Sequence, residues 1–157
     1  MAVASSVQEF LRCADVSYTV LRHRPAYTAP EEAAATHVPG RDWAKTVICF
    51  ADGEPIEAVV PANQRVNLEW LAALAGVSSI RLASEDELNW LFPDCEPGAV
   101  PPLGPLFKQT VFVDQSLAGE ERIAFPAGTH TDAVEMRFRD FAAVARPVVG
   151  RFAVRPH

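Results

Sequence analysis

The basic residues include only two lysines, and one of them lies where a cation could do chemistry. Lys45 follows Ala44 in an alternating apolar segment that continues through Val47. Three interpretations fit a lysine there: a charge on an edge strand that prevents aggregation, a side chain that extends to solvent, or a compact cation in a pocket, beside a phosphate or a carbonyl oxygen. The residue types alone leave all three open.

A proline-rich segment could supply fixed backbone amides. Residues 93–105 hold five prolines and two glycines, and because proline restricts the backbone before folding, we expect a rigid loop. Within the motif Gly98–Pro102, only the first three residues carry a backbone N–H, since the last two are prolines. A pair of such donors can stabilise a developing oxyanion, and an ordinary surface turn is the alternative.

The third candidate is the tripeptide Gly128-Thr129-His130, between two predicted strands. Gly128 permits a close approach of the backbone, and His130 can form a hydrogen bond with a polar group of a ligand; a histidine in a plain hairpin loop is the alternative. No serine or cysteine lies in a nucleophile-elbow context, and no Ser-His-Asp arrangement is found. Any hydrolysis is therefore expected to use water rather than a covalent intermediate.

Length and composition predict one globular domain over residues 1–157, with 49% hydrophobic and 22% charged residues. No apolar run is long enough to span a membrane, and the first residues do not resemble a secretory signal, so a cytoplasmic protein is expected. Three cysteines and four histidines are scattered along the chain. They form neither a disulfide framework nor a metal-ligand cluster, so no metal or other cofactor is expected.

Charge is distributed unevenly along a chain whose formal net charge is −6. Residues 52–96 contain nine acids and two bases, whereas residues 137–157 contain five arginines and one acid. A second basic group is Arg22-His23-Arg24. Two interpretations stay open: an uneven solvated surface, or a basic face for a phosphate-bearing partner.

The periodicity of apolar residues predicts an α+β fold, with a mixed and strongly curved sheet flanked by helices. Thr28 with Glu31, and Ser84 with Glu87, are capping boxes that mark two helix starts. The helices are expected at residues 3–14, 28–37, 67–76, 84–92 and 140–145. The strands are expected at residues 17–23, 43–51, 55–61, 79–82, 106–113, 122–125 and 133–138, with an Asp-Gly turn between the second and third.

Taken together, short blocks over roughly residues 17–145 resemble the YbaK/prolyl-tRNA synthetase editing-domain family, in the family's order. The lysine strand and the Gly-x-x-x-Pro loop are the more specific of these motifs. The blocks are Tyr27-Thr28, Glu31-Glu32-Ala33, Ala44-Lys45-Thr46-Val47, Val59-Val60-Pro61-Ala62 with Arg65-Val66, Leu82 to Glu87, Pro97 to Gly104, Val113 to Leu117, and Ala127 to His130.

The resemblance implies a free-standing deacylase that hydrolyses the ester between a wrong amino acid and the 3′ end of a tRNA. Lys45 would neutralise the terminal phosphate or the carbonyl, the amides of Gly98 and Ala99 would hold the carbonyl or its oxyanion, and His130 would position the aminoacyl group or the ribose. Further substrate contacts are expected from Tyr27, Thr28, Val100, Pro101, Pro102, Gly128 and Thr129. The family's fold is a curved mixed sheet flanked by helices, and its members need no metal.

The expected partner is aminoacyl-tRNA, bound at its acceptor end, with an aminoacyl-tRNA synthetase as a further candidate. Small amino acids are favoured as the group removed, because a small pocket hydrolyses what fits and excludes the correct residue. The competing hypothesis is a non-catalytic module of the same fold that binds tRNA or a synthetase. Deacylation of a panel of misacylated tRNAs separates the two.

Overall fold

A long β-hairpin lies at the centre of the computed structural model, which describes residues 2–156. Strand β2 (Ala44–Ala51) pairs antiparallel with β3 (Glu54–Pro61) along its whole length. Asp52 and Gly53 turn the chain with φ values of 48° and 84°. A tight hairpin turn requires such positive values, so the predicted hairpin and its Asp-Gly turn are confirmed.

The hairpin belongs to a mixed sheet, in which β3 and β6 run parallel, as do β6 and β9, while the other neighbours are antiparallel. Across this sheet the order is β5 (Ile80–Leu82), β2, β3, β6 (Thr110–Asp114) and β9 (Val148–Gly150). A second, antiparallel sheet has the order β1 (Thr19–Arg22), β8 (Asp132–Arg137) and β7 (Arg122–Pro126). The strands β4 (Arg65–Val66) and β10 (Ala153–Val154) form a separate pair.

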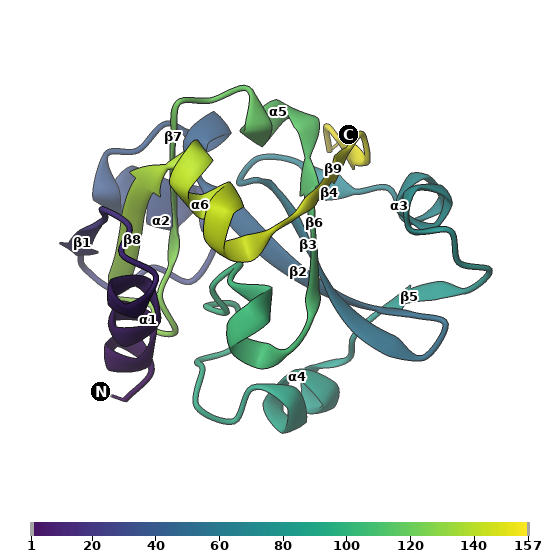
Figure 1. Cartoon of the computed structure of the whole chain (residues 1–157), viewed down its shortest axis with the longest axis horizontal. Coiled ribbons are helices and arrows are strands. Elements are labelled where there is room, and N and C mark those ends of the chain that lie inside the picture. Colours follow the sequence, from purple (N-terminus) through teal and green to yellow (C-terminus); the bar gives the residue numbers. More distant parts are fainter. Residues whose placement is uncertain (1, 157) are drawn as a thin grey trace.

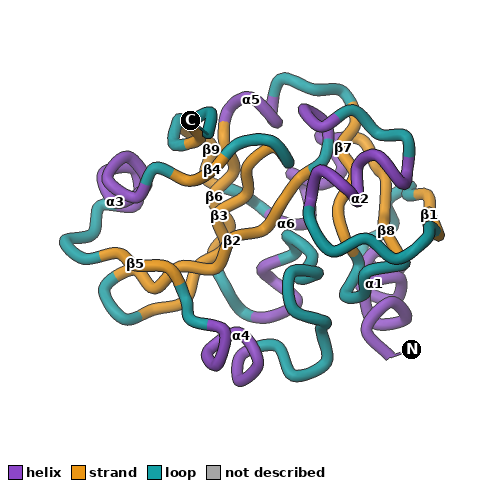
Figure 2. The backbone as a smooth tube through the Cα atoms, turned by 180° about the vertical axis from the view of Figure 1, so that it is seen from behind, coloured by secondary structure: helices purple, strands orange, loops and turns teal. Residues whose placement is uncertain are grey.

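Helices flank the sheets, so the predicted α+β class with a mixed sheet and flanking helices is confirmed. Helix α6 lies in front in Figure 1, whereas α2 lies in front in the opposite view of Figure 2, so these two helices are on opposite sides of the molecule. The helices are α1 (Ala2–Cys13), α2 (Ala29–Thr36), α3 (Leu68–Ala75), α4 (Glu85–Leu91), α5 (Gln115–Ala118) and α6 (Phe138–Ala145), with 3-10 helices η1 (Gly40–Asp42) and η2 (Gly104–Phe107).

The starts of α2 and α4 form the capping boxes that the sequence predicts. The Thr28 hydroxyl accepts a hydrogen bond from the backbone N–H of Glu31, and the Glu31 carboxylate accepts one from the backbone N–H of Thr28. Ser84 and Glu87 repeat the arrangement. Each box satisfies amides that a helix start leaves unpaired, so these local signals alone determine where both helices begin.

Strand β3 is buried on both faces, because successive side chains of a strand point in opposite directions. Val59 packs into the hydrophobic cluster that contains Phe125 and Phe141. Ala58 and Val60 face the other cluster, beneath α3. All three residues of this strand are fully buried, so β3 is the central element of the fold.

Some predicted boundaries are wrong. The strand expected over residues 106–113 begins only at Thr110, because Pro105 starts the 3-10 helix η2 and Lys108 ends it in a left-handed conformation. Phe138, expected to end a strand, instead opens α6. The short strands β4, β9 and β10 and the helix α5 were not expected from the sequence.

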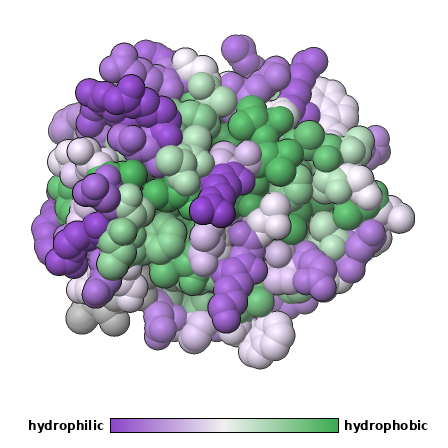
Figure 3. Space-filling model, in the orientation of Figure 1, coloured by the Kyte–Doolittle hydropathy of each residue, from purple (hydrophilic) through white to green (hydrophobic). Residues whose placement is uncertain are grey.

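The surface in Figure 3 shows apolar side chains in separate areas, with hydrophilic side chains between and around them. The most exposed large apolar side chains of the described chain include Trp90, Tyr27 and Leu82. None of the described helices is long and apolar enough to cross a membrane.

Candidate functional site

A cavity of about 440 Å³ lies where α2, β2 and the proline-rich loop meet. The segment before α2 contributes Tyr27 and Thr28 to its wall, β2 contributes Lys45, and the loop contributes Gly98 and Val100. These five residues are among those that the sequence predicts for the site, although the chain separates the first from the last by more than 70 residues.

Lys45 is half-buried, and its Nζ atom donates a hydrogen bond to the backbone carbonyl of Gln64 at 2.6 Å. Burial lowers the pKa of its ammonium group, because a low-dielectric environment disfavours the charged form. No carboxylate of the described residues forms an ion pair with it. The cation in this cavity is therefore not neutralised by a carboxylate from the described part of the chain.

The loop before Pro101 is tied to the tip of the β7–β8 hairpin. The backbone N–H of Gly128 donates to the carbonyl of Ala99 at 2.8 Å, and that of Glu96 donates to the carbonyl of Gly128 at 2.9 Å. Gly98 has a φ of 83°, a value that residues other than glycine rarely adopt. The positive φ expected at Gly98 is therefore present.

The amides of this loop differ from what the sequence predicts in one respect. The N–H of Ala99 donates to the carbonyl of Glu96 at 3.0 Å, and Ala99 is fully buried. Ala99 therefore cannot serve as an oxyanion donor in this conformation, which corrects its predicted role. In the described part of the chain, the N–H groups of Gly98 and Val100 have no hydrogen-bond partner, and both residues line the cavity.

Pro101 and Pro102 are buried and do not line the cavity. Gly128 and Thr129 also lie outside its wall. The Thr129 hydroxyl donates to Oδ2 of Asp132 at 2.7 Å, within its own loop. The structure thus gives these four residues positions that shape the loops rather than direct access to the cavity, in contrast to the expected substrate contacts.

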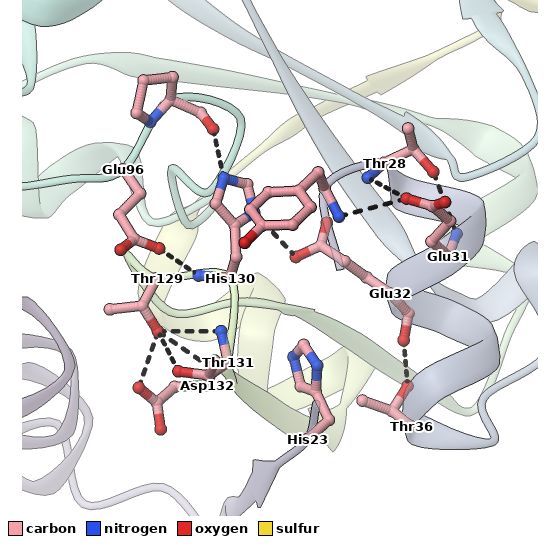
Figure 4. A network of polar contacts seen from close by, with 12 residues as sticks. His23, Thr28, Glu31, Glu32, Thr36, Glu96, Thr129, His130, Thr131 and Asp132 are labelled. Atoms are coloured by element: carbon pink, nitrogen blue, oxygen red, sulfur yellow. Dashed lines mark hydrogen bonds and ion pairs between the residues drawn. The ribbon is translucent and has the colours of Figure 1, made fainter. Parts of the chain in front are cut away.

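His130 lies behind the cavity wall rather than in it, with 8% of its surface exposed. Its ring packs against the ring of Tyr27, with the centroids 4.9 Å apart. Its backbone N–H donates to Oε1 of Glu96 at 2.6 Å, and its Nε2 atom lies 2.7 Å from the carbonyl oxygen of Pro97. Figure 4 shows His130 beside the loop that carries Glu96.

One residue of the site was missed by sequence reasoning. Glu32 lines the cavity from the first turn of α2 and is 1% exposed, and burial raises the pKa of its carboxyl group to about 8. Its Oε2 atom lies 3.9 Å from Nδ1 of His130 (Figure 4). Adjacent glutamates at a helix start suggest two solvated charges, yet only Glu31 is exposed and caps the helix, while Glu32 faces inwards.

Several buried polar atoms around the cavity have no hydrogen-bond partner among the described residues. They include Nε1 of Trp43 and Oγ1 of Thr46, which both belong to cavity-lining residues, and Oε2 of Glu32. Buried polar groups are normally paired, so these atoms leave hydrogen-bonding capacity unused beside the cavity. Within the described residues, no three His, Cys, Asp or Glu side chains are grouped to hold a metal ion.

Comparisons with known proteins identify the family of the chain. A family model described as the aminoacyl-tRNA editing domain matches residues 23–144. The prolyl-tRNA editing protein ProX of Acetoanaerobium sticklandii is 25% identical over 138 residues, which cover 83% of both chains. A proline–tRNA ligase of Nitratidesulfovibrio vulgaris strain Hildenborough is 32% identical over 95 residues; the match covers 60% of this chain and only 16% of the ligase.

Solved structures agree on the fold. The hypothetical protein APE2540 superposes with a TM-score of 0.85 at 24% identity, over 95% of this chain and 99% of that one. A protein described as a candidate trans-editing enzyme for prolyl-tRNA synthetase gives a TM-score of 0.81 at 21% identity, over 100% and 99% of the two chains. The family model covers most of the chain and includes the lysine strand, the Gly-x-x-x-Pro loop and the Gly-x-His motif. These matches confirm the resemblance found in the sequence, and the chain belongs to the aminoacyl-tRNA editing domain family.

Proposed function

We propose that the chain, acting as one domain over residues 1–157, hydrolyses the ester of a misacylated tRNA in trans. The observation that carries this proposal is the cavity itself. Among the described residues, it combines a lysine without a carboxylate partner, Lys45, with two unpaired backbone amides, those of Gly98 and Val100. A cation and two fixed donors around one cavity suit a substrate that is an anion at its phosphate and becomes an oxyanion at its carbonyl.

The chemistry assigned to each group follows from its position. The free amides of Gly98 and Val100 would hold the carbonyl oxygen of the aminoacyl ester while water attacks the carbon. Lys45 would exchange its hydrogen bond with Gln64 for one to the terminal phosphate or to the carbonyl oxygen. The exposed ring of Tyr27, backed by His130, forms the part of the wall that would contact the ribose or the aminoacyl group.

We propose the tRNA for proline as the nucleic-acid substrate, because the ProX relative is named a prolyl-tRNA editing protein and another relative is a proline–tRNA ligase. Prolyl-tRNA synthetase is then the natural partner. The cavity of about 440 Å³ must hold the terminal ribose as well as the amino acid. We therefore propose a small wrong amino acid, and rejection of the correct one by size or pose.

The test is a deacylation assay with tRNA for proline charged in turn with alanine, serine, cysteine, threonine and proline. We expect faster hydrolysis than in buffer for at least one small residue and none for proline. The same panel on a tRNA for another amino acid measures the contribution of the tRNA body. Binding without hydrolysis of any ester would contradict the proposal and identify a non-catalytic module.

A further inference from the structure

The backbone determines which nitrogen of the His130 ring carries a hydrogen. Nε2 lies 2.7 Å from the carbonyl oxygen of Pro97. A carbonyl oxygen can only accept a hydrogen bond, so Nε2 is the donor and carries a proton. Nδ1 is then the ring nitrogen that carries a free lone pair.

Nδ1 faces the Glu32 carboxyl, whose Oε2 atom is 3.9 Å away. The two side chains are 10% and 2% exposed, and neither atom has another hydrogen-bond partner in the described part of the chain. An unprotonated Nδ1 beside an ionised carboxylate would place lone pairs against each other without water to separate them. One proton between the two atoms removes this conflict.

The proton is better placed on Glu32 than on His130. A neutral acid beside a neutral imidazole avoids the desolvation of two charges, which a buried ion pair must offset. Burial likewise raises the pKa of the Glu32 carboxyl to about 8, so the acid form predominates at neutral pH. The separation of 3.9 Å is about 1 Å longer than a hydrogen bond, so the bond requires the two side chains to approach each other by about that distance.

We propose that Glu32 is a positioning residue, which donates a hydrogen bond from its carboxyl group to Nδ1 of His130 and thereby holds the ring in one orientation behind Tyr27 and Gly98. Its position in the wall of the cavity makes this arrangement sensitive to what binds there. The inference rests on the proposed function only for its activity measurement, because the proton itself can be observed in the free protein.

Other charged or titratable groups surround the pair from each neighbouring element. Lys45 on β2 lines the same cavity, and Tyr27 covers the histidine ring. Glu96 on the proline-rich loop binds the backbone N–H of the histidine, and Glu31 on α2 caps its own helix. The Glu32 pKa is raised by burial. These neighbours are unchanged in a variant at position 32, so they cancel when variant and wild type are compared.

The first test uses ¹⁵N NMR of the ring of His130 in the free wild-type protein. We expect a protonated Nε2 and an unprotonated Nδ1 at neutral pH, with a titration of the ring signals near pH 8 when Glu32 loses its proton. In Glu32→Gln the amide N–H can donate to Nδ1 in the same way, so the tautomer is kept and this titration disappears. In Glu32→Ala the titration disappears as well, while the Pro97 carbonyl keeps the proton on Nε2.

The second test is the ratio of deacylation rates of wild type and Glu32→Gln at each pH, after the hydrolysis in buffer is subtracted. The ratio removes the titration of the substrate's own amino group. We expect it to be constant below about 8 and to fall above it, approaching tenfold per pH unit for a single ionisation. Glu32→Ala should be slower at every pH, by on the order of 100-fold, because the ring is no longer held in place.

Glu31→Gln is the matched control, since it alters an exposed carboxylate on the same helix and should keep the wild-type alkaline fall. A titration near pH 8 that persists in Glu32→Gln, or a wild-type Nδ1 that is protonated at neutral pH, would overturn the proposal. The wild-type spectra show whether Nδ1 is protonated at neutral pH even if a variant does not fold. If no misacylated tRNA is hydrolysed, the proposed function fails, while the NMR result still decides the pairing of Glu32 with His130.

Discussion

Among the described residues, Lys45 is held by one hydrogen bond, from Nζ to the carbonyl of Gln64. We predict that Lys45→Ala lowers kcat/KM for deacylation by a few hundredfold, because the loss of a donor to developing charge costs about 3–4 kcal/mol. Lys45→Arg should not restore the rate, since the planar guanidinium differs in shape from an ammonium group.

The control for that measurement is Lys108→Ala, which removes the only other lysine of the sequence. Lys108 ends the 3-10 helix η2 and does not line the cavity. Its replacement should leave the rate within a factor of about two, in keeping with a surface change of less than about 0.5 kcal/mol. An equal loss of rate in the two variants would exclude a specific function of Lys45 in the reaction.

Gly98 combines a positive φ of 83° with a place in the cavity wall. A Cβ there would lie 3.6 Å from Cε1 of His130, an ordinary contact, so the strain comes from the backbone rather than from a clash. Gly98→Ala should cost about 1–2 kcal/mol of stability. It should also lower the deacylation rate by about 100-fold, because the amide of residue 98 moves away from the carbonyl.

The variant Gly53→Ala separates the loss of stability from the loss of deacylation activity. Gly53 has nearly the same φ, 84°, and a Cβ at this position would enter open space, with no other described atom within 4 Å. The stability lost in Gly53→Ala therefore comes from the backbone conformation alone. Urea denaturation should show the same loss of stability in both variants, and only Gly98→Ala should lose activity. If both were fully active, the amide of residue 98 would have no part in catalysis.

Residue types and their resemblance to a family led directly to Lys45 and Gly98, because each has a property that few residues share. Ala99 was assigned wrongly, since its amide donates to the carbonyl of Glu96, and a hydrogen bond inside a turn has no sequence signature. Glu32 was missed because the sequence does not show which of two adjacent glutamates faces inwards. That depends on the side of α2 that packs against His130.

At the scale of elements, the start of α2 controls the position of Glu32. We predict that Thr28→Ala lowers the free energy of unfolding by about 1 kcal/mol, as is usual for the loss of a helix cap. It should also lower the deacylation rate, because the first turn that carries Glu32 loses the hydrogen bond from the Glu31 amide to Thr28. Chemical denaturation and the deacylation assay measure the two effects.

The matched variant is Asn67→Ala, which removes the cap of α3. The Asn67 side chain accepts a hydrogen bond from the backbone N–H of Trp70, and neither residue lines the cavity. A similar loss of stability with unchanged activity is expected. Loss of activity in both variants would mean that activity follows overall stability rather than the local position of α2.

The elements that the sequence predicted well are those whose signals are local. Two capping boxes and an Asp-Gly turn determine their own geometry within a few residues. The strands β4, β9 and β10 have only two or three residues, and they exist because partners far along the chain hydrogen-bond to them. Strands of two or three residues are too short for an apolar period to identify them reliably.

For the whole molecule, the most unusual ionisable group is Glu57 in the middle of β3. It is fully buried, neither carboxylate oxygen has a hydrogen-bond partner among the described residues, and burial raises its pKa well above the usual value. The folded state therefore binds more protons than the unfolded state. The contribution of this group to stability is highest below the unfolded pKa of about 4.3 and falls as the pH rises from there towards the raised folded pKa.

We predict that Glu57→Leu raises the free energy of unfolding at neutral pH by about 1–3 kcal/mol, because an unpaired buried polar group is removed. Glu57→Gln should mainly flatten the decline of stability with pH. Urea denaturation of both variants and wild type at acidic and neutral pH checks this. A decline in Glu57→Gln as steep as in wild type would show that other groups cause it.

The carboxyl group of Asp114, in the same sheet, has a pKa shifted in the opposite direction. Burial alone would raise its pKa, but hydrogen bonds from Ser116, Phe152 and Ala153 outweigh this effect and lower it. Its contribution to stability is present above the unfolded pKa and is lost as the pH falls through the folded one. Asp114 thus joins β6 to the C-terminal segment, and Glu57 has no such compensation from the described residues.

The two larger sheets meet at a bridge between Trp43 and Ala124. Lys45 follows this bridge on one sheet, whereas His130 belongs to the hairpin of the other. A small opening at this joint would reshape the cavity while each strand kept its own ladder of hydrogen bonds, but it would also expose the core that Ala44 and Val59 share with Phe125 and Val134. A ligand that contacts both sides would oppose that separation by mass action. Substrate that contacted Lys45 on one sheet and the loop of His130 on the other would therefore add to this shared core in holding the two sheets together.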